Sequence, residues 1–130
     1  MYIEVFSLCD AATNDMGKLN ILGAFDTIWM TQAPGIHPQC AVVLRVRFAS
    51  SERGEHRLTV SFVNADGKHI IPSTSGMINV NFPNQQRTGS ANLILNIHGL
   101  KIETLGEYSI DLSIDGKNVA SLPLFVMLKK

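Results

Sequence analysis

The sequence lacks most of the features from which a function is usually inferred. Its 130 residues include two cysteines and one tryptophan, and no apolar run reaches the about 18 residues of a membrane-spanning helix. The N-terminus has no basic segment ahead of an apolar stretch, so we expect a cytoplasmic protein without a secretory leader. Lys plus Arg equals Asp plus Glu, at 11 each. We therefore expect neither nucleic acid nor a membrane among its partners.

Residues that carry catalysis or bind metals are present, but not in the spacings that this chemistry needs. His37 and Cys40 are close in sequence, whereas a structural zinc site needs four nitrogen or sulfur ligands in paired local spacings. Asp111 and Asp115 alternate with serines, which predicts a solvated strand face and no catalytic pair. No glycine elbow surrounds a serine, and no phosphate-binding loop precedes a helix. We expect no catalytic residue, metal or cofactor, and we expect Cys9 and Cys40 to be buried free thiols.

What the sequence does contain is alternation of apolar and polar residues, which predicts β-strands. Residues 40–48 are the clearest case, with Val42, Leu44 and Val46 on one face and Arg45 and Arg47 on the other. The same pattern recurs in residues 58–62, 78–82, 93–97 and 108–114. Because each strand is half polar, two sheets have to share one core. We predict an antiparallel β-sandwich of eight or nine strands, in one domain over residues 1–130.

Tyr108 gives this sandwich an immunoglobulin-like, Greek-key tendency. It follows Leu105-Gly106-Glu107 and starts a strand that alternates without interruption. Immunoglobulin-like sandwiches place a tyrosine at such a corner, where its hydroxyl bonds back to the backbone. The alternative is an ordinary aromatic residue at the start of a strand.

Four segments resemble a known family. They are "LNILGAFDTIW", "HPQCAVVLRVRF", "ANLILNIHGLKIETLGEYSIDLSIDG" and "ASLPLFV". They are similar to the recurring segments of a family of small, mainly bacterial proteins described only as a domain of unknown function, over about Tyr2 to Val126. The resemblance implies a stand-alone β-sandwich with no assigned activity, and it supplies no catalytic residues.

Trp29 and His37 stand in the most unusual segment, "IWMTQAPGIHPQC". If one strand ends at Trp29 and the next begins at Cys40, the connection has about the ten residues expected of a crossing between sheets. We expect Trp29 to close one end of the sandwich. The alternative is a binding site, since loops at a sandwich end often carry binding residues.

A polar surface is predicted from four asparagines, Asn79, Asn81, Asn92 and Asn96. They are expected on one exposed face of two neighbouring strands joined by "PNQQRTGS". Such a face is either a platform for a polar ligand or partner, or an amide ladder that discourages aggregation of sheet edges.

The terminal strands predict self-association. Phe6 and Leu8 near the N-terminus, and Phe125 and Met127 near the C-terminus, are expected on the second face of apolar strands. A two-layer fold has one interior, so this face requires a cover. A twofold dimer provides one, and the alternative is the Met30–Gln39 loop folding back.

These observations favour a non-enzymatic protein-binding or assembly module, a homodimer with an unidentified protein partner. The alternative is a small-ligand carrier or small enzyme with a pocket at the Trp29 to Cys40 end of the sandwich.

Overall fold

The computed structural model, which describes residues 1–130, consists of strands and contains no α-helix. One short 3-10 helix, η1, covers Ser50–Glu52. The strands are β1 (Tyr2–Asp15), β2 (Lys18–Ala24), β3 (Thr27–Met30), β4 (Gly35–Ala49), β5 (Gly54–Asn64), β6 (Thr74–Val80), β7 (Thr88–Ile102), β8 (Gly106–Ile114) and β9 (Lys117–Leu128). The chain has no helix with the length and apolar character that crossing a bilayer requires.

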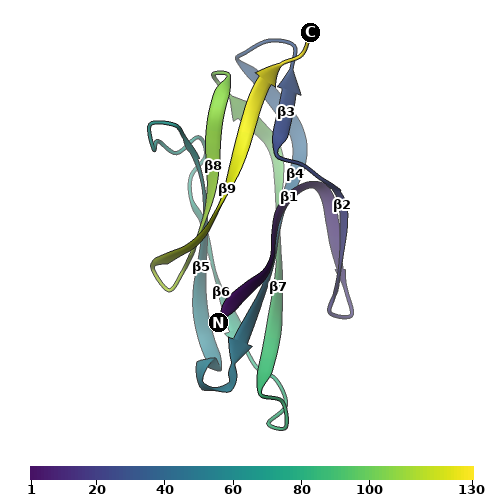
Figure 1. The fold of residues 1–130 in the computed structure, drawn as a ribbon, viewed down its shortest axis with the longest axis vertical. Coiled ribbons are helices and arrows are strands. Elements are labelled where there is room, and N and C mark those ends of the chain that lie inside the picture. The colour runs from purple at the N-terminus through teal and green to yellow at the C-terminus, as the bar shows by residue number, and fades with distance from the viewer.

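The strands form two sheets that pack around one core (Figure 1). The first sheet has the order β2-β1-β4-β7, and the second has the order β3-β9-β8-β5-β6. Phe48 of β4 and Phe62 of β5 are the largest fully buried side chains, and they come from opposite sheets. An all-β chain with two sheets around a shared core is therefore confirmed.

One strand pair departs from the antiparallel prediction, because β3 runs parallel to β9. The strand expected to end at Trp29 is a separate short strand, because the chain leaves the first sheet after Ala24 and enters the second at Thr27. Phe25 and Asp26 make this transition, with Phe25 N donating to Leu8 O in one sheet and Asp26 O accepting from Phe125 N in the other. Every other pair of strands is antiparallel.

β4 is an inner strand of the first sheet, between β1 and β7, and its alternation follows the prediction. Val42, Leu44 and Val46 face the core and are at most 2% exposed. The strand begins at Gly35, earlier than predicted, because Gly35 to Gln39 pair with the end of β7. The connection from β3 is therefore residues 31–34 and not the predicted ten, although it does cross from one sheet to the other.

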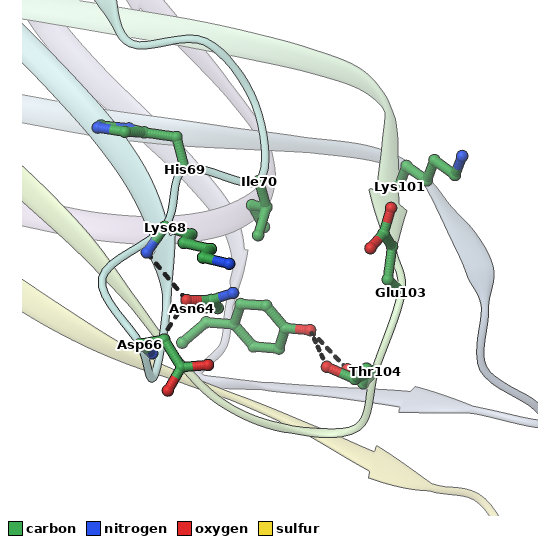
Figure 2. A pocket seen from close by; sticks show the side chains of 9 residues that line it. Asn64, Asp66, Lys68, His69, Ile70, Lys101, Glu103 and Thr104 are labelled. Carbon is green, nitrogen blue, oxygen red and sulfur yellow. Dashed lines mark hydrogen bonds between the residues drawn. The ribbon is translucent and has the colours of Figure 1, made fainter.

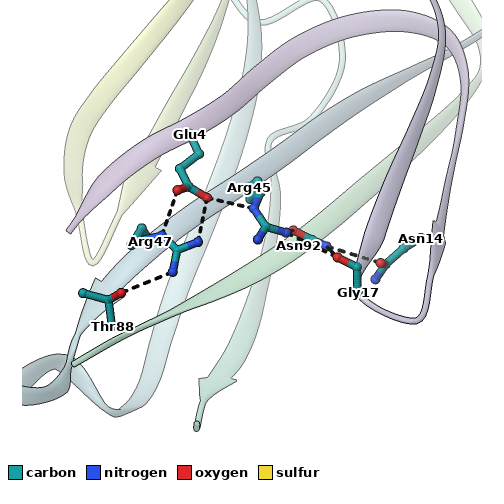
Figure 3. Close-up of polar contacts among 7 residues, drawn as sticks. All are labelled: Glu4, Asn14, Gly17, Arg45, Arg47, Thr88 and Asn92. Atoms are coloured by element: carbon teal, nitrogen blue, oxygen red, sulfur yellow. Dashed lines mark hydrogen bonds and ion pairs between the residues drawn. The ribbon is translucent and has the colours of Figure 1, made fainter. Parts of the chain in front are cut away.

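The outer face of the first sheet is covered by the chain's own β1–β2 hairpin. β1 pairs with β4 as far as Cys9 and with β2 from Cys9 onward. Ala12 and Leu19 of the hairpin pack on a second buried cluster that contains Cys9 and Val43. At the hairpin tip, Gly17 O accepts hydrogen bonds from side chains of β4 and β7 (Figure 3). On this sheet the cover is therefore a hairpin of the chain itself, and not the Met30–Gln39 loop that was the alternative to a dimer.

Polar contacts on the same face join three strands (Figure 3). Glu4 of β1 accepts from Arg45 Nε and Arg47 Nε, each at 2.8 Å. Hydrogen bonds from Arg47 and Arg45 hold the pKa of the Glu4 carboxyl below its usual value. Arg47 Nη1 also donates to Thr88 Oγ1 at 3.2 Å, and Arg45 Nη1 donates to Asn92 Oδ1 at 3.1 Å. These contacts hold β1 and β7 to β4, the strand between them.

Candidate functional site

Several connections and the C-terminus gather at one end of the molecule, at the top of Figure 1, which we call the C-terminal end. β3 and β9 end there, and β4 and β8 begin there. The connections are residues 31–34, 65–73 and 103–105. Four surface hollows of about 300 to 410 Å³ are lined by residues of this end. This end therefore has the most concave surface that could bind a ligand or partner.

Trp29 lies at this end but does not close it, so that prediction is wrong. The residue is 59% exposed. The reason is the alternation of β3, which turns Ile28 and Met30 into the core and leaves Trp29 on the outer face.

His37 is half-buried, and its environment is unusual. Its ring centroid lies 5.7 Å from that of Phe25. The buried Nε2 atom has no hydrogen-bond partner. Two hollows, of about 360 and 410 Å³, are both lined by Ile28, Trp29 and His37. The structure therefore brings the two residues singled out in the sequence to the same hollows.

An apolar patch covers the outer face of the second sheet at the C-terminal end. In the β3–β9 register Trp29 lies beside Met127, and Phe125 lies beside Thr27. We define the apolar patch as the exposed residues Trp29, Leu105, Phe125 and Met127. A hollow of about 360 Å³ runs between Leu105 and the β9 members of the patch, with Glu107 on its rim.

The structure separates the four residues predicted to drive self-association. Phe125 and Met127 are exposed in the apolar patch, as the alternation of β9 requires. Leu8 is 2% exposed and Phe6 packs against the main core, so both point between the sheets and the prediction of an outer face is wrong for them. The outward residues of β1 are instead Val5 and Cys9, which pack under the hairpin.

The four asparagines do not share one face, which corrects the predicted polar platform. Asn79 lies on β6 in the second sheet, and Asn81 follows the end of that strand. Asn92 and Asn96 lie on β7 in the first sheet. The segment between β6 and β7 is therefore a crossing between sheets and not a hairpin loop, although its composition suits either.

A polar hollow of about 300 Å³ lies between the 65–73 and 103–105 connections (Figure 2). Asn64 Oδ1 shapes one wall by accepting from the backbone nitrogens of Asp66 and Lys68. Lys68 and Glu103 approach the hollow from opposite sides, and neither forms an ion pair. The lining contains no serine or cysteine that a base could activate.

Tyr108 forms another wall of this hollow, and its hydroxyl donates to Thr104 O at 2.5 Å (Figure 2). The ring is buried in the main core. The predicted bond from a corner tyrosine back to the preceding backbone is therefore confirmed.

The opposite end, which carries the N-terminus in Figure 1 and which we call the N-terminal end, contains a histidine that sequence reasoning missed. His56 Nδ1 lies 2.6 Å from Asp115 Oδ2, and Nε2 lies 2.6 Å from Glu52 O. Both neighbours are acceptors, so the ring is best satisfied with a proton on each nitrogen. The hydrogen bond to Glu52 O, followed by that to Asp115, raises the pKa of His56. Because both ring nitrogens are hydrogen-bonded, His56 holds Glu52 and Asp115 together and has no nitrogen free to act as a base.

The cysteines have the character of core residues. Cys9 and Cys40 are buried and unbonded to each other. Burial raises the pKa of the Cys40 thiol to about 11, so the thiol stays protonated at neutral pH and is a poor nucleophile. No group of three or more His, Cys, Asp or Glu side chains is arranged to hold a metal ion.

The family model of a family of unknown function (DUF6941) matches residues 4–127, and the chain belongs to this family. The resemblance found in the sequence is thereby confirmed. No protein of curated function matches the sequence.

Two solved structures are similar in fold. A β-glucosidase from Listeria innocua, in complex with isofagomine, matches 97% of this chain with a TM-score of 0.54 and 9% identity. The alkylpurine DNA glycosylase AlkC of Pseudomonas fluorescens, bound to DNA containing an abasic site analog, matches 97% with a TM-score of 0.50 and 6% identity. The chain covers 16% and 30% of these proteins. At such identities the likeness concerns the fold alone.

Proposed function

We propose that the chain is a non-enzymatic protein-binding module that docks on its partner through the apolar patch. The patch is the observation that carries this proposal. It gathers large apolar side chains from β3, β9 and the 103–105 connection on one surface. Contiguous apolar surface of this kind marks interaction sites in proteins. The hollow beside Leu105 would accept an apolar side chain of the partner.

The partner's chemistry is suggested by Glu107. This carboxylate is exposed on the rim of the patch hollow and pairs with no cation of the chain. A basic residue beside an apolar anchor would complement it, since opposite charges at an interface rim favour the correct partner. We therefore propose a partner segment that combines a large apolar side chain with Lys or Arg.

The proposed scaffold is an immunoglobulin-like β-sandwich with Greek-key connections. The orders β1-β4-β7 and β9-β8-β5-β6 correspond to strands A-B-E and G-F-C-C′ of that fold. The Tyr108 hydrogen bond to Thr104 also supports it. A cytoplasmic location is part of the proposal, supported by two thiols that remain unpaired.

The test compares two methionines of the second sheet. Met127→Glu places a charge in the apolar patch, whereas Met77→Glu places the same charge at a similarly exposed position on β6. Proteins retained from the source organism's lysate by each variant are quantified by mass spectrometry. We expect a partner that Met77→Glu and wild type retain and that Met127→Glu loses at least tenfold.

Glu107→Lys sharpens this test, because it reverses the charge that selects a basic partner. We expect a weaker loss than for Met127→Glu, and one that shrinks as salt is added. A partner retained equally by wild type and Met127→Glu would show that the patch is not the docking surface.

A small-ligand carrier is the second candidate, and the unpartnered Nε2 of His37 favours it. To bond to this nitrogen, a ligand in one of the two hollows lined by Trp29 and His37 would have to displace the atoms that cover it. Native mass spectrometry of protein purified from its own cells tests this idea. A small molecule bound to wild type and absent from His37→Phe would support it. If both proteins have only the mass of their polypeptide chain, the idea is contradicted.

A further inference from the structure

The long strand β7 leaves one of its edges without a partner. It lies at the margin of the first sheet, and its neighbour on the inner side is β4. Outside the strand ladders, no backbone hydrogen bond of the chain involves residues 88–102. The donors and acceptors that point away from β4, at every second residue, therefore have no partner within the chain.

This edge also lacks the features that normally keep sheet edges apart. Natural edge strands are protected by lysines, other charges or prolines. Residues 88–100 of β7 contain no Lys, Arg, Asp, Glu or Pro. An unprotected edge of this length would pair with exposed strands of other proteins and aggregate, unless a specific strand already occupies it.

The inward side chains of β7 point to the same conclusion. Leu93 and Leu95 face the core but remain partly exposed, whereas Val42 and Leu44 of the neighbouring β4 are almost fully buried. The difference arises because no strand lies beyond β7. A further strand would cover both leucines.

The sequence of the edge indicates which strand this is. The segment Asn92-Leu93-Ile94-Leu95-Asn96 reads the same in both directions. On either side of it the residues match in type: apolar Ala91 and Ile97, then polar Ser90 and His98, then Gly89 and Gly99. Antiparallel pairing places one sequence against the reverse of the other. A second copy of β7 centred at Ile94 thus meets like residues along the ladder.

We propose that two copies of this chain pair through β7, antiparallel about a twofold axis at Ile94, so that their first sheets join into one continuous sheet. This register opposes Leu93 to Leu95 and Asn92 to Asn96, and keeps inward residues opposite inward residues. A shift by one residue would set leucines against outward residues, which sheets with one buried face do not tolerate. The uncharged edge opposes no like charges. The proposal does not depend on the apolar patch.

The test is a register-specific disulfide. In the proposed dimer residue 94 faces its own copy, with Cα atoms about 4.5 to 5.5 Å apart, which a disulfide can bridge. Residue 96 faces residue 92, so the two copies of residue 96 lie four residues apart along neighbouring strands, about 14 Å from each other. Ile94→Cys and Asn96→Cys are oxidised under mild conditions, with wild type as the control for the buried Cys9 and Cys40. We expect Ile94→Cys to run largely as a covalent dimer, and Asn96→Cys and wild type as monomers.

Sedimentation equilibrium at tens of micromolar then measures the mass of wild type and of Met127→Glu. This second measurement needs no introduced cysteine. We expect both to have the mass of a dimer. A monomeric wild type would overturn the proposal, as would crosslinking of Asn96→Cys in place of Ile94→Cys. A wild-type dimer that Met127→Glu dissociates would assign the contact to the apolar patch, overturning β7 pairing while leaving a binding role for the patch.

Discussion

The two ends of the molecule are built in opposite ways. At the N-terminal end polar contacts link the connections to one another: the N-terminal amine pairs with Glu52 at 2.9 Å, His56 bridges Glu52 and Asp115, and the Arg53 guanidinium stacks on Phe82 and bonds to its carbonyl. The C-terminal end carries the apolar patch and four surface hollows. The lesson is that the residues most conspicuous in the sequence lie at the open end, whereas less conspicuous residues close the other end.

The largest expected contrast is between one aromatic residue of each end. Phe48 is fully buried near the N-terminal end, where its ring stacks on His56 with centroids 4.8 Å apart, and Trp29 is mostly exposed. We expect Phe48→Ala to lower the free energy of unfolding by about 3–5 kcal/mol. Trp29→Ala should change it by less than about 0.5 kcal/mol. Urea unfolding followed by circular dichroism measures both. Equal losses would show that Trp29 does build the C-terminal end.

The sequence predicts the core well because burial of alternate residues is a local rule. Every second side chain of β4 from Cys40 to Phe48 is buried in the main core, as the pattern indicates. Alternation also explains why Trp29 is exposed, since its neighbours Ile28 and Met30 are the stronger inward pair. The error was to judge Trp29 by its size and not by its position in β3.

The sequence could not predict which of the two sheets the chain enters after each strand ends. The 81–87 segment has the composition of a hairpin loop, yet it connects different sheets, and this separates Asn79 from Asn92. The bend of β1 after Cys9, which places the hairpin on the first sheet, has no local sequence signal that we recognised. His56 and Asp115 are 59 residues apart, so only the pairing of β5 with β8 brings them together.

A smaller contrast concerns one glycine at each end. A Cβ on Gly89 would collide with the ring of Phe82, which Arg53 holds in place. A Cβ on Gly35 would meet chiefly the terminal methyl of Met30, a flexible side chain that can move aside. We expect Gly89→Ala to cost about 1–3 kcal/mol through overpacking, and Gly35→Ala less than about 1 kcal/mol. Thermal unfolding of the two variants compares the ends directly. A greater cost at Gly35 would show that the open end is the more tightly packed one.

The smallest effect is a pH dependence confined to the N-terminal end. Because hydrogen bonds to Glu52 O and Asp115 raise the pKa of His56, the folded chain holds a proton that the unfolded chain releases at a histidine's ordinary pKa of about 6.5. The stabilisation is therefore complete below that pH and is lost as the pH rises through the higher folded value. Urea unfolding at intervals from about pH 6 to 9 measures this decline, and wild type minus His56→Gln isolates it from other titrating groups. Asp115→Asn should reduce the decline without abolishing it, because the bond to the Glu52 carbonyl remains. His37→Gln, at the open end, is the matched control and should leave the decline intact. A decline that persists in His56→Gln would mean that another group is responsible, and that the polar closure of this end does not depend on a charged His56.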